Sequence, residues 1–258
     1  MIFDKPDFEL IICDNYHQLA EQVVKRILDL SRTTIKNRGV FSIALSGGST
    51  PKGLYFRMAS PDYRNQFKWN QIHFFWGDER WVPIDDIRSN YRMAAEALLT
   101  KCDIPPENIH PIKTKEVTPE VSAGLYEQDL VSHFKLRKSE LPRFDLILLG
   151  VGQDGHIASL FPGNKALTEK KKFVVSTSVE DVEEPRVTLA LPVINQAHHV
   201  IFMVSGVEKA AIVGQVLGKS GRKDILVPAQ LVDPERGTRS WFIDKAAMSV
   251  LENRIAST

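Results

Sequence analysis

Short apolar runs alternate with longer amphipathic segments along most of the chain. Continuous apolar runs of this length are typical of strands that are buried on both faces of a parallel sheet. The runs that predict strands are 8–13, 40–45, 72–76, 144–149, 173–177, 186–191, 199–205 and 240–243. The alternation predicts an α/β fold with a mostly parallel, doubly wound, Rossmann-like sheet and helices on both faces.

The segments between the apolar runs carry helix signals. The clearest has Leu19, Val23, Ile27 and Leu30 three or four positions apart, which places them on one face of a helix. Asn15 can cap its start, and Gly39 can end it. Further helices are predicted after Pro51, over 91–100, over 119–138, after Gly206 and at the end of the chain.

Four polar features follow predicted strands directly, at 46–53, 78–80, 150–156 and Lys209. In an open parallel sheet, ligands bind at the carboxyl ends of the strands, near the point where the strand order reverses. We therefore expect these four features to meet in one site at that edge of the sheet.

The first feature, Ser46 to Gly53, joins a strand to a helix through glycines and a proline. Backbone N–H groups at such a helix start suit a phosphate group, although a tight turn with a serine cap would have the same sequence. The spacing matches neither the nucleotide P-loop nor the dinucleotide fingerprint.

The turn at 150–156 presents His156 between glycines. Histidine can transfer protons near neutral pH, and glycines allow the backbone to approach a ligand closely. Asp154 could orient the imidazole or remain solvated. The charged run Asp78 to Arg80 is predicted to be a loop at the same edge, although such runs are commonly solvent-facing.

Composition narrows the classes of function. The chain has 258 residues with 33 basic and 32 acidic side chains, so no global field recruits nucleic acid or an anionic membrane. Cys13 and Cys102 lie far apart and outside any CxxC pattern, which favours a reducing compartment. The chain shows neither a secretory signal nor an apolar stretch of membrane-spanning length, so we expect a cytoplasmic protein. No linker divides it, which predicts a single domain over 1–258.

Four segments together resemble one family. They are SGGSTPKG, FFWGDERWVP with SNYRMAAEALL, DLILLGVGQDGHIASLFPG, and PRVTLALPVINQAHHVIFMVSGVEKA. In this order they are similar to the 6-phosphogluconolactonases, within the superfamily that includes glucosamine-6-phosphate deaminase. The deaminases continue after the histidine with an Asn-Glu-Pro type segment, whereas this chain has Ser159 to Gly163, SLFPG, which resembles the lactonase form.

The resemblance implies hydrolysis of 6-phospho-D-glucono-1,5-lactone to 6-phosphogluconate, the second step of the oxidative pentose phosphate pathway. It implies a small sugar-phosphate lactone as the partner, and neither a metal nor an organic cofactor. Nucleic acid and membrane are not expected partners. The sequence leaves the oligomeric state open, between a monomer and a small homo-oligomer.

The chemistry of a lactonase assigns roles to the residues of the four features. His156 is expected to be the general base on water, and either Asp78 or Asp154 orients it. Arg80 is expected to contact the lactone oxygens or the tetrahedral oxyanion. By resemblance to the superfamily, the substrate phosphate is expected to be held by Gly47, Gly48, Ser49, Arg186 and Lys209.

The same residues are also considered for a covalent mechanism, a metal site and two other functions. Ser159 lies near His156 but is not in a GxSxG elbow, which disfavours a covalent mechanism. No HExxH motif appears, and His17, His73, His110 and His133 are expected to be surface or packing residues. The competing functions are an aminosugar-phosphate deaminase and a catalytically silent sugar-phosphate sensor on the same fold.

Overall fold

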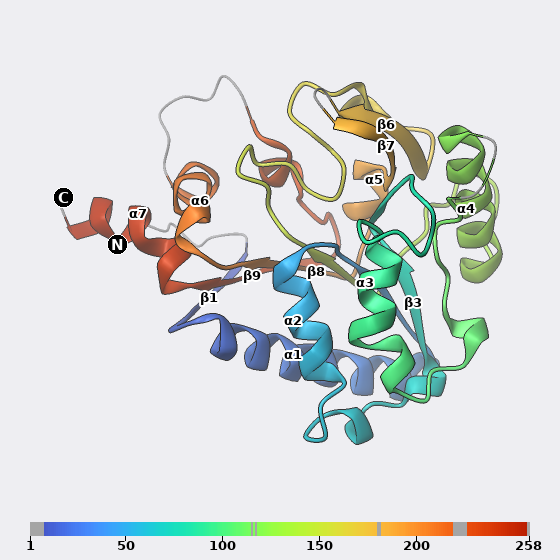
Figure 1. The fold of residues 1–258 in the computed structure, drawn as a ribbon, viewed down its shortest axis with the longest axis horizontal. Coiled ribbons are helices and arrows are strands. Elements are labelled where there is room, and N and C mark those ends of the chain that lie inside the picture. Colours follow the sequence, from blue (N-terminus) through green and yellow to red (C-terminus); the bar gives the residue numbers. More distant parts are fainter. Residues whose placement is uncertain (1–7, 115, 117, 180–181, 219–225, 257–258) are drawn as a thin grey trace.

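A six-stranded parallel sheet forms the centre of the molecule (Figure 1). The computed structural model describes residues 8–114, 116, 118–179, 182–218 and 226–256. The strand order is β1-β9-β8-β5-β2-β3, and every neighbouring pair is parallel. The strands are β1 (Glu9–Cys13), β2 (Phe41–Leu45), β3 (Ile72–Trp76), β5 (Leu146–Leu149), β8 (His199–Val204) and β9 (Thr238–Asp244). The predicted α/β fold class is confirmed.

Helices cover both faces of this sheet. The α-helices are α1 (Tyr16–Arg38), α2 (Ser49–Met58), α3 (Asn90–Ala97), α4 (Pro119–Phe134), α5 (Leu191–Ile194), α6 (Ala210–Leu217) and α7 (Lys245–Ala256). α1 and α2 pack together on one face, and Figure 1 shows α6 on the opposite side of β8 and β9. The Asn15 side chain caps α1, and Gly39 ends it with a φ of 84°, as the sequence predicts.

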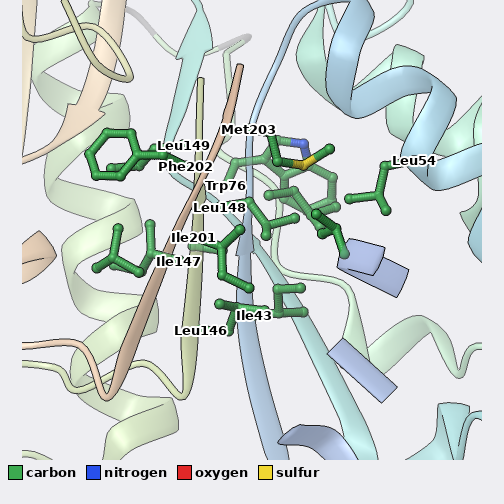
Figure 2. Packing of buried hydrophobic residues seen from close by; sticks show 14 of the residues in the cluster. Ile43, Leu54, Trp76, Leu146, Ile147, Leu148, Leu149, Ile201, Phe202 and Met203 are labelled. Carbon is green, nitrogen blue, oxygen red and sulfur yellow. The ribbon is translucent and has the colours of Figure 1, made fainter. Parts of the chain in front are cut away.

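The central strands are buried on both faces. Side chains alternate across β5, so that Ile147 and Leu149 point to one side and Leu148 to the other (Figure 2). Leu148 lies on the face of the sheet against which Trp76 and Leu54 of α2 pack. This burial is the reason that the strands read as continuous apolar runs rather than as alternating ones.

A second, antiparallel sheet lies beside the first and corrects two expectations. It has the order β4-β7-β6, with β4 (Asp78–Arg80), β6 (Val174–Val179) and β7 (Val182–Leu189). The run 78–80, which was expected to be a loop, is therefore a short strand paired with β7. β6 and β7 were correctly predicted as strands, but they do not join the parallel sheet, because an apolar run does not specify its partner.

Several helix boundaries also differ from the prediction. Ser89 caps α3, which ends at Ala97 and is followed by a short 3-10 turn, η3 (Leu99–Lys101). α4 ends at Phe134 rather than at 138, because Lys135 takes a left-handed conformation with a φ of 51°. The remaining 3-10 turns are η1 (Arg64–Gln66), η2 (Trp69–Gln71), η4 (Pro106–Asn108), η5 (Lys165–Thr168), η6 (Val207–Lys209) and η7 (Pro228–Leu231).

Candidate active site

A hollow of about 220 Å³ opens at the carboxyl ends of β2, β5 and β8. β2 and β5 are neighbours in the sheet, but the chain continues from β2 to β3 on one side and from β5 to β8 on the other. The hollow therefore lies at a switch point of the sheet, where α/β proteins bind ligands. A larger hollow of about 690 Å³, between α4 and β6, contains none of the predicted site residues.

Most of the predicted residues line the smaller hollow. They are Gly47, Gly48, Ser49, Asp78, Arg80, His156 and Lys209. Asp154 and Arg186 do not line it, but each contacts or faces a residue that does. Asp154 hydrogen-bonds His156, and Arg186 is paired with Arg80 across β4 and β7. The four features thus meet at one edge of the sheet, as the sequence predicts.

The His156 ring is held by the turn that carries it. Oδ1 of Asp154 lies 2.6 Å from Nδ1 of His156, and the same oxygen accepts the backbone N–H of His156 at 3.1 Å. An ionised carboxylate only accepts hydrogen bonds, so the contact selects the tautomer of the neutral ring that has the proton on Nδ1 and the lone pair on Nε2. The ring also lies against Phe161, with 4.2 Å between the ring centroids.

Gly152 makes room for this pair. A β-carbon at Gly152 would lie 2.1 Å from Nδ1 of His156 and 2.5 Å from Oδ1 of Asp154. Both contacts are far inside van der Waals distance, so the pair and a larger residue cannot occupy the same space. The glycine-rich turn therefore serves the imidazole–carboxylate contact.

The carboxylate of Asp78 does not contact His156 but bonds two other side chains. Its carboxylate is buried and accepts a hydrogen bond from Oγ of Ser159 at 2.7 Å and one from Nδ2 of Asn90 at 3.3 Å. The backbone N–H of Ser159 also donates a hydrogen bond to Oγ1 of Thr188 on β7. Of the two carboxylates that could orient His156, it is Asp154 that contacts the ring in the described residues.

Glu79 and Asn90 are site-forming residues that the sequence analysis did not single out. The buried Glu79 carboxylate accepts the backbone N–H groups of Arg80, Asn90 and Tyr91 and the Ser89 hydroxyl, so it ties β4 to the start of α3. Burial raises its pKa to about 7. Of this arrangement, the sequence analysis indicated only the charged run at 78–80.

Asn90 links two walls of the hollow. Its Nδ2 donates to the backbone oxygen of Asp78 at 2.9 Å, and a β-carbon at Gly47 would lie 2.1 Å from its Oδ1. Gly47 therefore has to be small for the loop after β2 to approach Asn90. The contact joins residues 43 positions apart, which is why no local pattern indicates it.

The start of α2 forms the anion-attracting wall of the hollow. Gly48, with a φ of 102°, precedes the helix, and Ser49 and Thr50 open it within the lining. The first N–H groups of a helix have no acceptor inside it and carry a partial positive charge, which suits a phosphate. Lys209 lines the same hollow and forms no ion pair with a described residue.

Arg80 and Arg186 place two guanidinium groups close together. The residues are directly paired across β4 and β7, and each has a buried Nε without a hydrogen-bond partner among the described residues. Burial, and next the charge of Arg80, lower the pKa of Arg186. An anion bound between these groups would relieve their repulsion.

The fold and the site define a doubly wound α/β protein with a histidine–carboxylate pair facing an anion-attracting helix start. The chain belongs to the family of glucosamine-6-phosphate isomerases and 6-phosphogluconolactonases, whose family model matches residues 14–241. In the described part of the chain, no helix has the length and hydrophobicity to cross a membrane.

Similar proteins include a 6-phosphogluconolactonase of Synechocystis sp., which is 39% identical over 242 residues covering 94% of this chain and 97% of the relative. A solved structure of the 6-phosphogluconolactonase from Trypanosoma cruzi is 30% identical, covers 97% of this chain and 98% of that one, and has a TM-score of 0.85. A monomeric glucosamine-6-phosphate deaminase has the same fold, at 21% identity and a TM-score of 0.77 over 94% of this chain and 100% of that one.

Proposed function

We propose that this chain hydrolyses 6-phospho-D-glucono-1,5-lactone to 6-phosphogluconate, the second step of the oxidative pentose phosphate pathway. The observation that carries the proposal is the Asp154–His156 pair, because His156 lines the same hollow as the start of α2. The similarity to named 6-phosphogluconolactonases over almost the whole chain supports it.

His156 is the general base. Its Nε2 removes a proton from a water molecule as the water oxygen attacks the lactone carbonyl carbon. The Asp154 carboxylate on Nδ1 holds the required tautomer and stabilises the imidazolium that forms. When the ring C–O bond breaks, the imidazolium returns the proton to the departing ring oxygen, which leaves the open-chain carboxylic acid.

Arg80 stabilises the charge that develops on the carbonyl oxygen. It lines the hollow together with His156, and one of its terminal nitrogens is positioned by the backbone oxygen of Arg88. A guanidinium stays charged at any working pH, so its attraction for an oxyanion does not depend on proton transfer. Asp78 supports this wall through its bonds to Ser159 and Asn90.

The phosphate of the substrate is held at the start of α2. The backbone N–H groups of Gly47, Gly48 and Ser49 and the ammonium of Lys209 surround the anion, while Arg186 adds positive potential from behind Arg80. Binding at this remote group positions the lactone ring against His156, which lowers the entropic cost of the reaction.

The deciding measurement is the hydrolysis rate of freshly generated 6-phosphogluconolactone, compared with the spontaneous rate. Wild type is expected to exceed the spontaneous rate, and His156→Ala to lose about 10²-fold or more of the enzymatic rate. His17→Ala, which changes an exposed histidine, is the matched control. A wild-type rate equal to the background rejects the proposal, and ammonia release from glucosamine 6-phosphate would then point to deaminase chemistry.

We also propose that the protein works in the cytosol on this small molecule alone, without nucleic acid or membrane. Both cysteines are free thiols, and Cys13 is buried, which suits a reducing compartment. Fractionation of cells with a tagged chain tests this location, and recovery of the enzyme in an organelle or membrane fraction would contradict it.

A further inference from the structure

Three histidines from distant parts of the chain meet at the outer edge of the six-stranded sheet. His73 is the second residue of the edge strand β3, His110 follows η4, and His133 is in the last turn of α4. One ring nitrogen of each lies within 4.8 Å of the corresponding nitrogen of the other two. None of the three lines the hollow at the carboxyl ends of the strands.

The backbone brings these histidines together in a defined way. His73 and Phe75 alternate with Phe74 along β3 and therefore share the face that α4 covers. The backbone N–H of His110 donates to the oxygen of Phe74 at 2.9 Å, so the segment after η4 runs along the free edge of β3. The three rings are thus attached to three separate structural elements.

Phe75 fixes the orientation of two of the rings. Its ring is stacked on His110, with 4.2 Å between centroids and 7° between planes, and it meets His133 edge-on at 4.9 Å. The rings of His73 and His133 are 4.5 Å apart. A cluster held by an aromatic ring is pre-organised, because its side chains lose little freedom when a ligand binds.

The nitrogen positions resemble those around a metal ion. Nδ1 of His73 lies 3.1 Å from Nε2 of His110. Two imidazole nitrogens bound to one tetrahedral Zn²⁺ at 2.0–2.1 Å would be separated by roughly 3.3 Å. Without an ion, the same two nitrogens would share a proton, so the distance alone fits both arrangements.

The position of Asp129 also supports a metal-binding role for His110. Its carboxylate oxygens lie 3.1 and 3.2 Å from Nδ1 of His110, on the side of the ring away from His73. A carboxylate that accepts from one ring nitrogen leaves the lone pair on the other nitrogen, and this arrangement accompanies most histidine ligands of metals. Here that lone pair, on Nε2 of His110, points to His73 and the centre of the cluster.

All three histidines of the cluster are partly buried. The charged groups that face these rings are Asp129, Glu107 and Lys135. His110 and Asp129 also line a hollow of about 520 Å³.

We propose that His73, His110 and His133 bind one divalent transition-metal ion of the kind that prefers imidazole, with Zn²⁺ as the expected ion. The ion joins β3, the segment after η4 and α4, and its fourth position is open to water. Its role is to stabilise the edge of the sheet, away from the lactone site. The proposal rests on the cluster alone and does not depend on the proposed function.

The test measures Zn²⁺ binding by calorimetry after treatment with a chelator and its removal. All proteins carry His156→Gln as well, because the active-site histidine could bind Zn²⁺ itself. One ion is expected to bind per chain, and at 100 times its dissociation constant it is expected to raise Tm by on the order of 5–10 °C. Mg²⁺, which prefers oxygen ligands, is expected to have no effect.

Three variants separate a built site from chance association. His133→Gln is expected to abolish the single binding event and the rise in Tm, whereas His17→Gln, at an exposed histidine, is expected to keep both. Asp129→Asn keeps all three ligands and is expected to weaken binding about 10–100-fold. Circular dichroism verifies that each variant is folded before titration.

Cobalt offers a readout that does not depend on stability. Co²⁺ bound by three histidines and water is expected to give visible absorption bands of a four- or five-coordinate ion, which disappear with His73→Gln. If the protein that carries only His156→Gln shows no saturable Zn²⁺ or Co²⁺ binding, or if adding His133→Gln or His73→Gln leaves its binding unchanged, the proposal is overturned and the cluster is a hydrogen-bonded packing group.

Discussion

The hydroxyl of Ser159 donates a 2.7 Å hydrogen bond to the buried carboxylate of Asp78. This bond links the turn after β5 to β4 and stabilises the wall of the site. Ser159 does not line the hollow that contains His156, and Asp78 is not the carboxylate that contacts His156.

Removing this hydroxyl tests its structural role. Ser159→Ala takes a donor from a buried carboxylate and is expected to lower the free energy of unfolding by about 1.5–3 kcal/mol. Lactone hydrolysis is expected to persist, since no bond to Ser159 forms in the reaction. Denaturant unfolding and steady-state kinetics measure the two effects, with Ser249→Ala on α7 as the control. Loss of activity as large as that of His156→Ala would contradict the assignment.

Asp154 is expected to act through His156. Asp154→Ala removes the acceptor from Nδ1, so the ring can adopt the wrong tautomer and the imidazolium loses a counter-charge. We expect kcat to fall by about 10-fold or more, but by less than with His156→Ala. The pH profile of kcat, measured for both variants, should move with Asp154→Ala. An unchanged profile and rate would show that Asp154 is only a surface carboxylate.

Gly152 provides a steric test of the same pair. The β-carbon of Gly152→Ala would overlap both His156 and Asp154, so one of them has to move. Activity is expected to fall toward that of His156→Ala. Gly124→Ala, in α4, adds a methyl group in open space and is expected to leave activity unchanged while stabilising the helix by up to about 1 kcal/mol. Normal activity of Gly152→Ala would mean that the observed ring position is not required.

Lys209 is expected to contribute to substrate binding rather than to the chemical step. Lys209→Gln removes a charge from the hollow, and a charged hydrogen bond is worth about 1.5–3 kcal/mol, so KM should rise roughly 10–100-fold with a smaller change in kcat. Lys52→Gln, in the first turn of α2 but outside the lining of the hollow, is the control. A pure fall in kcat would instead place Lys209 in the chemical step.

Glu79 is expected to make stability depend on pH. Its pKa is about 7 in the folded protein and roughly 4.3 when unfolded, so between these values the folded state binds more protons than the unfolded state. The contribution of Glu79 to the free energy of unfolding therefore falls as pH rises from about 4 to 7 and is constant above.

Glu79→Gln tests this sign. The variant is expected to be destabilised at every pH, because it cannot accept all four of the hydrogen bonds that reach the carboxylate. The difference from wild type should shrink between pH 5 and pH 8, as measured by urea unfolding at several pH values. A difference that grows with pH would mean that the hydrogen bonds keep Glu79 ionised in the folded protein.

The sequence by itself determined the features that depend on local spacing. The strand runs, the caps of α1 at Asn15 and Gly39, and the polar residues after β2, β3, β5 and β8 are all encoded within a few positions. Parallel strands place their carboxyl ends at one edge, so the meeting of His156, Arg80 and Lys209 followed from the strand assignment.

Only the tertiary structure decided which distant groups pair. β4 forms because residues Asp78 to Arg80 pair with β7. The carboxylate of Asp78 accepts a hydrogen bond from Ser159, which comes from a distant part of the chain. The cluster of His73, His110 and His133 likewise depends on the packing of β3 against α4. A single sequence records the periodicity of each segment, whereas contacts between segments depend on register and packing that no local pattern specifies.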